Sequence, residues 1–329
     1  MKIIKERLFN NRGVALITVL LIISILIAVA VELNRSSRAE IYDATNISDG
    51  IRLTYIAKSG FYAGSALLVN FPHDSVSLRD EWARAELLSA KGQSLFPDGF
   101  FVVAIEDEAG KIPLNKLVGN DGKFNADVKD MLIRLLTLPE FGLDEKKAVD
   151  IVEAIKDWID NDEEVEGAGG AESSYYASLD PSYTAKNLPL DCIEELLMIK
   201  GITKELFAGT KEKPGLAQYL TIYGDGYINI NTAPALVLRA LSPSISTEIA
   251  GKMDEYRRNT GNNLANMLWY KTISGLEAVP IKPALITTKS NYFKISSSGK
   301  LNNMERKISG VVRMATGNKS FQTISWRLE

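Results

Sequence analysis

The chain has 329 residues, which is enough for one large domain or two modest domains with a buried core. Its hydrophobic content of 46% and charged content of 24% are ordinary for a globular protein. After the first 13 residues, 34 basic side chains stand against 40 acidic ones, and this balance argues against a protein whose task is to hold nucleic-acid backbones.

Cysteine and histidine occur once each, which excludes several kinds of site. With Cys192 alone no intrachain disulfide can form, and its helix-like surroundings favour a small buried hydrophobe over a reactive thiol. With His73 alone, in a turn-like stretch, a His-rich zinc site is excluded, and a Ser-His-Asp triad would depend on that one residue. No nucleophile with a partner base is evident, so we assign no catalytic residue and expect no enzyme.

The N-terminal segment is a basic leader, residues 1–13, followed by 18 apolar or small residues, Val14 to Val31. At about 1.5 Å per residue this run reaches about 27 Å, close to the hydrocarbon thickness of a bilayer. The leader favours a cytoplasmic N-terminus and an exported remainder. A cleaved secretory signal is the alternative, because residues 28–30 (Ala-Val-Ala) form a cleavage pattern.

The residues that follow argue against that cleavage. No proline occurs before Pro72, and apolar residues recur at helical spacing, namely Ile41, Ile47, Ile51, Tyr55, Tyr62 and Leu67. We therefore predict one continuous helix that begins at Val14, ends near Val69 and makes up the segment 14–70, with residues 14–31 in the membrane.

Two segments beyond this helix read as strands. Residues 71–115 end in "GFFVVAIEDEAGKIPLN", which predicts a strand, a turn at Gly110 and an extended exit through Pro113. Residues 286–329 contain three short alternating runs, which predict strands of the same antiparallel sheet.

Residues 116–285, between these strands, have helical patterns. Asp144 is the expected N-cap of a helix with Val152, Ile155 and Ile159 on one face. A second helix, around Cys192, ends at Gly201; a third begins at the N-cap Thr232 with Pro234 in its first turn, and residues 246–261 form its partner. The sequence therefore predicts an α+β fold, in which a long N-terminal helix and an antiparallel sheet carry an inserted all-helical domain.

The helical pairs of this insertion resemble helix-hairpin-helix or SAM-like units. Such hairpins can bind DNA where a Gly-x-Gly turn lets backbone amides approach a phosphate. The turns here, "EFGLD", "KGITK" and "SPSIS", contain one glycine or none. Structural packing is thus favoured, with no nucleic acid as partner. A signal-anchored periplasmic helix-hairpin-helix protein for nucleic-acid binding or uptake remains the alternative function.

The acidic loop, residues 157–172, is the richest stretch chemically. Six carboxylates fall within ten positions, and a glycine-rich bend then leads to Glu172; the six are Asp157, Asp160, Asp162, Glu163, Glu164 and Glu166. Crowded carboxylates are costly to ionise unless they are solvated or share a cation. Hard oxygen ligands on a flexible loop suit calcium, although the spacing is not that of an EF-hand. A calcium site and a solvated loop are both open at this point.

The N-terminal pattern resembles the class III signal of type IV pilins and type II secretion pseudopilins. In that family the prepilin peptidase cuts after the glycine, here Gly13, and methylates the new N-terminus, here Val14. The family pattern has glutamate at the fifth mature position, where this chain has Thr18. A subunit with nothing above it has no buried amine to neutralise, so Thr18 would cost it nothing. Alternatively, Thr18 only bonds its own helix backbone.

The order of "RGVALITVLL", "FVVAIEDEAGKIPLN", "DWIDND…GGAESSYY" and "INTAP" resembles the general secretion pathway protein K family of minor pseudopilins, over essentially the whole chain. The resemblance implies a pilin-like fold in the inner membrane with a periplasmic head. It also implies a role in initiating and capping the pseudopilus tip, with minor pseudopilins I and J and other pseudopilins as partners, and calcium bound in the insertion. Carried over by position, the calcium ligands are Asp160, Asp162 and Glu172, with Glu164, Glu166, Asp180 and Asn187 as secondary candidates.

Overall fold

The computed structural model describes residues 13–70, 75–92, 95–315 and 320–329. The leader residues 1–12 and His73 lie outside this part of the chain. The α-helices are α1 (Val14–Val69), α2 (Glu86–Gly92), α3 (Ala126–Thr137), α4 (Glu145–Ile159), α5 (Ser173–Ala177), α6 (Lys204–Ala208), α7 (Ala235–Leu241) and α8 (Thr247–Arg258). The strands are β1 (Gly99–Asp107), β2 (Ile112–Pro113), β3 (Leu220–Thr221), β4 (Ile228–Asn229), β5 (Ile286–Thr287), β6 (Tyr292–Leu301), β7 (Met304–Met314) and β8 (Phe321–Leu328).

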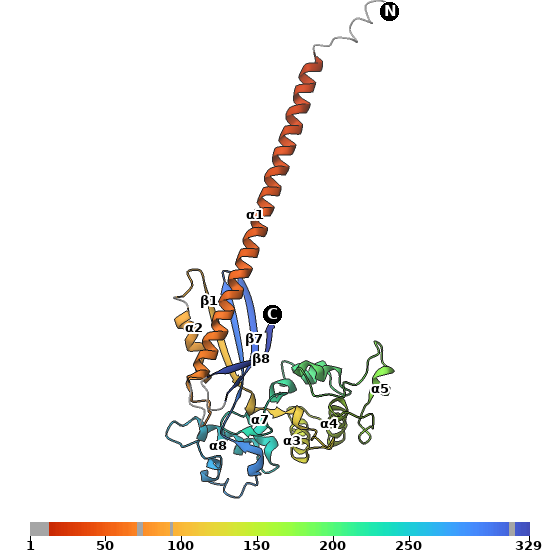
Figure 1. Cartoon of the computed structure of the whole chain (residues 1–329), viewed down its shortest axis with the longest axis vertical. Helices are drawn as coiled ribbons and strands as arrows, with labels where there is room; N and C mark the ends of the chain where they lie inside the picture. Colours follow the sequence, from red (N-terminus) through yellow and green to blue (C-terminus); the bar gives the residue numbers. More distant parts are fainter. Residues whose placement is uncertain (1–12, 71–74, 93–94, 316–319) are drawn as a thin grey trace, which may run out of the picture.

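The helix α1 confirms the predicted continuous helix. Its 56 residues extend over about 84 Å, and its first two thirds project from the head as an isolated rod (Figure 1). No glycine or proline interrupts residues 14–49, and every side chain of residues 14–48 is exposed. Among the described residues, α1 alone is long and apolar enough to cross a membrane, with a window of mean hydropathy 3.2.

The last third of α1 packs on the sheet through one face, which includes Leu53, Ile56 and Phe61. Gly60 lies at the closest approach: a Cβ atom there would stand 2.2 Å from Ser297 Oγ and 2.8 Å from Phe101. Because a larger residue would push the two layers apart, glycine is what permits this depth of packing.

The sheet is antiparallel, with the strand order β1-β6-β7-β8. Buried side chains alternate with exposed ones in most of β1 and with half-buried ones in β6, so one face packs on α1 and the other faces away. The register places Gly99 opposite Leu301 and Asp107 opposite Phe293. The strand before the inserted region, β1, and the strands after it thus form one sheet, and this confirms the predicted α+β arrangement.

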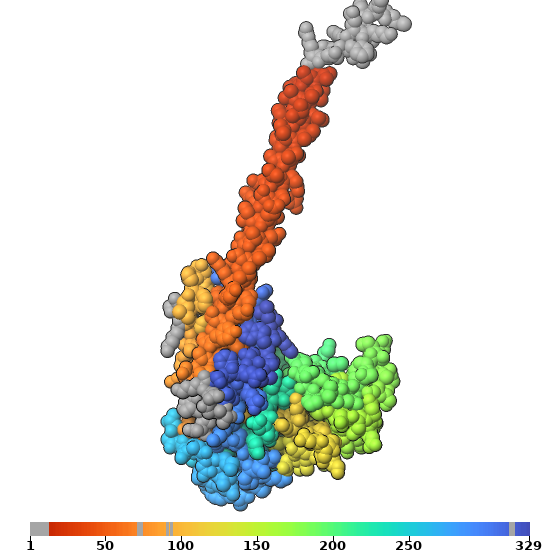
Figure 2. Space-filling model, viewed as in Figure 1, coloured from red at the N-terminus to blue at the C-terminus, as the bar shows by residue number. Residues whose placement is uncertain are grey.

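The inserted region, between β1 and β6, has a hydrophobic core of its own. That core is built from residues between Ile112 and Ile286, whereas α1 and the sheet share a second cluster. The insertion extends to one side of the axis of α1 and makes the head much wider than the rod (Figure 2). It is mostly helical, but two short parallel pairs, β2–β3 and β4–β5, also belong to it. The description of this domain as all-helical therefore needs that correction.

The two parts meet at the buried carboxylate of Asp107, the last residue of β1. Its Oδ2 accepts hydrogen bonds from Ser290 Oγ at 2.6 Å, Thr232 Oγ1 at 2.6 Å and Asn229 Nδ2 at 3.1 Å. Its Oδ1 accepts one from the backbone N–H of Ala109 at 2.9 Å. Ser290 lies where the chain returns to the sheet, so this one carboxylate ties the exit, the return and the inserted domain together.

Two local predictions in the insertion were wrong. Thr232 is not a helix cap, because α7 begins at Ala235 after Pro234, and the Thr232 hydroxyl is used by Asp107 instead. The predicted α-helix around Cys192 is a short 3₁₀-helix, Ile193–Met198, with Cys192 as its half-buried N-cap residue. Glu195 bonds the Asp191 and Cys192 N–H groups, so a local capping arrangement replaces a further helical turn.

Candidate metal centre

The C-terminal turn of α4 presents two carboxylates to the interior. Asp144 caps the start of the helix by accepting a hydrogen bond from the Lys147 N–H, as predicted. At the other end, Asp157 lies in the last turn and Asp160 is the C-cap. Because residues three apart share a helix face, the two carboxylates lie side by side.

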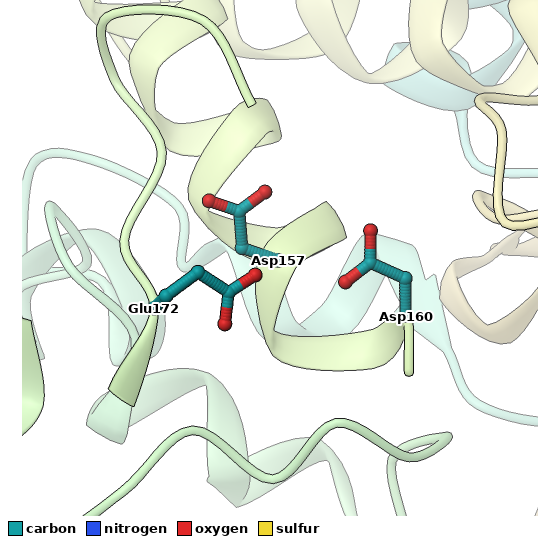
Figure 3. Close-up of side chains that lie close together, drawn as sticks. All are labelled: Asp157, Asp160 and Glu172. Carbon is teal, nitrogen blue, oxygen red and sulfur yellow. The ribbon is translucent and has the colours of Figure 1, made fainter. Parts of the chain in front are cut away.

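Glu172 completes a group of three. It is brought back by the acidic loop as the residue before α5, and Figure 3 shows the three side chains lying close together. One carboxylate oxygen from each of Asp157, Asp160 and Glu172 lies within 4.8 Å of the others. All three residues are buried, with exposed fractions of 0%, 3% and 1%.

Several oxygens of this group have no hydrogen-bond donor among the described residues. They are both carboxylate oxygens of Glu172 and Oδ1 of Asp160. A buried carboxylate without a donor is costly, because its hydration has been lost and nothing has replaced it. Three such oxygens in one buried group are the arrangement that a positively charged ligand would stabilise.

The loop around the group is held by its backbone. The Glu166 N–H donates to both oxygens of Asp157, at 3.1 and 3.2 Å, and the Gly169 N–H donates to Glu153 Oε2 at 2.8 Å. Gly170 packs against the site so closely that a Cβ atom would stand 2.3 Å from Asp157 Oδ2. The glycine-rich bend therefore lets the chain pass close behind the carboxylates, which a bulkier sequence would not permit.

The electrostatics of the group are those of crowded acids in a buried place. Burial, and then the neighbouring charges of Asp157 and Asp160, raise the pKa of Glu172 to about 8. Burial raises the pKa of Asp157 to about 6, although backbone N–H groups of Glu166 and Ala171 lower it. Burial also raises the pKa of Asp160, partly offset by Lys156. A cation bound among the three carboxylates would lower all of these pKa values.

The residues fit a calcium ion. Calcium binds oxygen ligands at 2.3–2.6 Å, so two ligands of one ion lie at most about 5 Å apart, which agrees with the span of this group. Three carboxylates supply up to six oxygens, and calcium accepts six to eight in irregular geometry. The donor set contains no nitrogen or sulfur, which disfavours zinc and copper.

The chain resembles known proteins along nearly all of its length. Residues 110–213, which include the three carboxylates, match the model of a family described as type II secretion system (T2SS), protein K. Over 325 residues the chain is 25% identical to type II secretion system protein K of Aeromonas hydrophila, covering 93% of this chain and 94% of that protein. It is 26% identical over 298 residues to the protein of the same name from Klebsiella pneumoniae, covering 86% of each. The chain is thus similar to type II secretion system protein K over most of its length.

The fold is also similar to that of a solved structure. A chain in the crystal structure of the GspK-GspI-GspJ complex from the enterotoxigenic Escherichia coli type 2 secretion system superposes with a TM-score of 0.67. The superposition covers 88% of this chain and 99% of that chain, at 19% sequence identity. The long helix, the sheet and the helical insertion are therefore a shared architecture.

The structure gathers only part of the ligand set carried over from the protein K family. Asp160 and Glu172 are in the buried group, but Asp162 is exposed, and its Oδ1 accepts from the Glu164 N–H. Glu166 lies at the rim and pairs with Lys156 at 3.1 Å.

The remaining candidates lie further out. Glu164 and Asp180 are exposed. Asn187 donates through Nδ2 to the backbone oxygen of Asp162 at 2.7 Å and to Glu163 Oε1 at 3.1 Å, while its buried Oδ1 has no donor among the described residues. These side chains shape the loop without reaching the group of three.

Asp157 was not among the predicted ligands, and the helical period gave no signal for it. It lies two residues after Ile155, which places it on the opposite side of α4 from that apolar residue. Its burial comes from the acidic loop, whose Glu166 N–H bonds its carboxylate and whose Gly170 packs against it.

The processing residues lie at the start of α1. Gly13 is its N-cap residue and Val14 its first residue, and both are exposed. The Thr18 hydroxyl donates to the Val14 carbonyl at 2.8 Å. Thr18 is thus satisfied within its own helix, which is compatible with both interpretations of this position.

Proposed function

We propose that this chain acts as a minor pseudopilin at the tip of the type II secretion pseudopilus, where it initiates assembly and caps the filament. The shape of the molecule carries this proposal: a bare apolar rod is joined to a head with a large lateral lobe (Figure 2). A rod that packs in a filament core leaves the head outside, and the lobe occupies space in which a further head would stack. The role is structural, and the proposed site binds an ion without catalysis.

Immunogold labelling of sheared pseudopili tests the tip position. With an epitope tag after Glu329, label is expected at one end of each filament. Label distributed along the shaft would contradict the proposal, and an equally tagged major pseudopilin provides the shaft control.

The same proposal includes processing and insertion in the inner membrane. Residues 14–31 form the membrane span, with the N-terminus in the cytoplasm and the head in the periplasm, as the basic leader favours. Prepilin peptidase is expected to cut after Gly13 and to methylate Val14. Intact-mass measurement of the chain expressed with the peptidase should show both changes, whereas a mature chain that begins at Val31 would refute the anchor.

The outer face of α1 is the surface proposed for minor pseudopilins I and J. Ile47, Ile51, Tyr55 and Tyr62 lie along one side of the helix, opposite the face that packs on the sheet, and are 54–65% exposed. Beside Ile51 and Tyr55, a hollow of about 290 Å³ is closed by Phe96 and Leu301. An apolar stripe that continues from the membrane span toward a hollow fits a second amphipathic helix laid along α1.

Calcium is the proposed ligand of the carboxylate group. Asp157, Asp160 and Glu172 would hold it, and the ion would supply the positive charge that the three buried carboxylates lack. Since the ion binds only the folded loop, it stabilises the head by mass action.

Calcium removal tests this directly on the full-length chain in detergent. Chelator should lower the melting temperature of the wild type, and this difference should vanish in Asp157→Asn and Glu172→Gln. Asp162→Asn is the matched control, because it removes an exposed carboxylate from the same loop. A control that loses the calcium effect as fully as the other two would instead place Asp162 among the ligands.

A further inference from the structure

Among the described residues, Lys156 is the one basic side chain that forms an ion pair with a member of the carboxylate group. It lies on α4 between Ile155 and Asp157, and its side chain is only 7% exposed. Its Nζ bonds Asp160 Oδ2 and lies 3.1 Å from Glu166 Oε2. The Phe124 ring, with its centroid 5.8 Å from Nζ, covers the ammonium from another side.

This contact divides the two oxygens of Asp160 between different tasks. Oδ2 bonds the Lys156 ammonium, and Oδ1, which has no donor among the described residues, remains for a cation. Asp160 can therefore offer only Oδ1 to a cation. Both of its oxygens could bind one ion only after the Lys156 ammonium had left Oδ2. The same ammonium also pairs with the Glu166 carboxylate at the rim of the group.

The charge balance of the group follows from these contacts. Asp157, Asp160 and Glu172 are three acids in one buried place, and Lys156 offsets the charge of one of them. Without a cation this attraction reduces the repulsion that would otherwise push the acidic loop away from α4. With a cation, the ammonium is a like charge one carboxylate away from the ion, and it opposes binding.

We propose that Lys156 is a built-in counter-charge of the metal site, which keeps the loop folded in the absence of calcium and weakens the affinity for calcium in exchange. The proposal rests on the calcium site proposed above. With this counter-charge, the head would fold without the ion and would become more stable when the ion binds. The stability of the head would therefore follow the calcium concentration in the periplasm.

The two effects of Lys156 on calcium binding differ in sign and in size. Its hydrogen bond orients Asp160 both with and without the ion, so its loss changes the binding equilibrium by only a small part of the free energy that a hydrogen bond to a charged group contributes. Its charge repels a divalent ion, and a unit charge about 5 Å away changes the affinity more than tenfold even at the dielectric constant of water. Repulsion therefore dominates, and a neutral residue of similar length should tighten binding.

The test uses the full-length chain in detergent, with calcium as the titrant in calorimetry. Lys156→Met should bind calcium at least tenfold more tightly than the wild type, and Lys156→Arg, which keeps the charge, should bind within about threefold of it. Lys147→Met is the matched control, because Lys147 is on the same helix but 69% exposed and paired with Asp144, and it should leave the affinity unchanged.

Melting temperatures give the second readout. In chelator Lys156→Met should melt below the wild type, and calcium should close that gap, so the calcium-dependent shift widens. Equal or weaker calcium binding by Lys156→Met, with a wild type that does bind, would overturn the role of Lys156 alone. Absence of binding by every variant, the wild type included, would overturn the calcium site and this inference with it.

Discussion

Asp107 shows how a single side chain can define the junction of two structural units. Its carboxylate accepts four hydrogen bonds, one from its own turn and three from the return segment and the inserted domain. An amide in its place would present an NH₂ group to donors, and Asn229 Nδ2 cannot accept a hydrogen bond.

We therefore expect Asp107→Asn to lower the free energy of unfolding by roughly 2–3 kcal/mol, because a buried set of donors loses its acceptor. Thermal melting of the full-length chain in detergent measures this. Thr221→Val, which removes a different buried hydroxyl that bonds Glu108, is a useful comparison because it lies outside the junction. A melting temperature within 1–2 °C of the wild type for Asp107→Asn would contradict the expectation.

The same residue predicts a dependence on pH. Burial raises the pKa of Asp107 to about 6 from its ordinary value near 4, even though Ser290, Thr232 and the Ala109 N–H lower it. The folded protein thus holds this proton more tightly than the unfolded chain does. Its contribution to stability is present below pH 4 and is lost as the pH rises from about 4 to about 6.

The difference in melting temperature between wild type and Asp107→Asn isolates this contribution from that of other acids. The wild-type advantage should shrink as the pH rises from 4 to 6 and then become constant. An advantage that grows across this range would show that the pKa of Asp107 is lowered by its partners instead of raised by burial.

Substitutions at Thr18 test whether this chain is a tip subunit or a shaft subunit. If nothing stacks above this chain, Thr18→Glu places an unpaired carboxylate among apolar helices and should reduce assembly, whereas Thr18→Val should be tolerated. Sheared-filament yield and secretion of a reporter are the measurements. Improved assembly by Thr18→Glu would mean that a neighbouring amine is available, and hence that the subunit lies within the shaft.

At the scale of elements, α1 has two apolar faces with different tasks. One face, with Phe61 and Gly60, is buried on the sheet, and the other, with Ile51 and Tyr55, is exposed. Folding accounts for the first face only. Since an exposed apolar stripe of this length is costly to leave in water, a partner is the physical reason for the second.

Replacing Ile51 and Tyr55 together by Asp should therefore weaken the complex with minor pseudopilins I and J at least tenfold while leaving the melting temperature almost unchanged. Co-purification and size-exclusion chromatography measure the first effect, and thermal melting the second. Tyr227→Asp alters an equally exposed tyrosine on the inserted domain and should have neither effect. Unchanged complex formation by the double variant would remove this face as the interface.

At the scale of the whole molecule, the head consists of two hydrophobic cores, which are joined at Asp107 and by further polar contacts such as Arg327–Glu194. The sheet closes between Asp107 and Phe293 with or without the insertion, because the two strands are direct neighbours. The insertion has its own hydrophobic cluster and extends sideways from the axis of α1 (Figure 1). Capping, in this view, is a property of the lateral lobe and anchoring a property of α1.

Removal of residues Gly110–Lys289, with a short Asn-Gly linker in their place, tests that division. The shortened chain should keep a membrane-inserted, sheet-containing head, visible by circular dichroism, because its own cluster does not use the lobe. The shortened chain should lose the ability to end a filament. Immunogold label on its epitope tag should then be found at several positions along the shaft. Label confined to filament ends would show that the lobe is not what caps.

The elements of the fold were largely predictable because their signals are local. The uninterrupted span of α1, the N-cap Asp144 and the alternation in β6 depend on neighbouring residues and on the fixed periods of helix and strand. The prediction that Thr232 caps a helix was wrong because its hydroxyl bonds the carboxylate of Asp107 instead. Asp107 is 125 residues away in the sequence, so no local pattern could reveal this partner.

The amino-acid sequence alone was enough to predict the long apolar helix, the antiparallel sheet, the position of the insertion and the acidity of the loop. Only the tertiary structure decided which acids meet: Asp157 replaces Asp162 beside Asp160 and Glu172, and Lys156 joins them. It also decided the junction, where Asp107 and Ser290 bond across 183 residues of sequence. The physical reason is that the period of a helix or strand fixes on which side of that element a residue lies. Which residues it contacts there depends on the path of the loops that fold over that side.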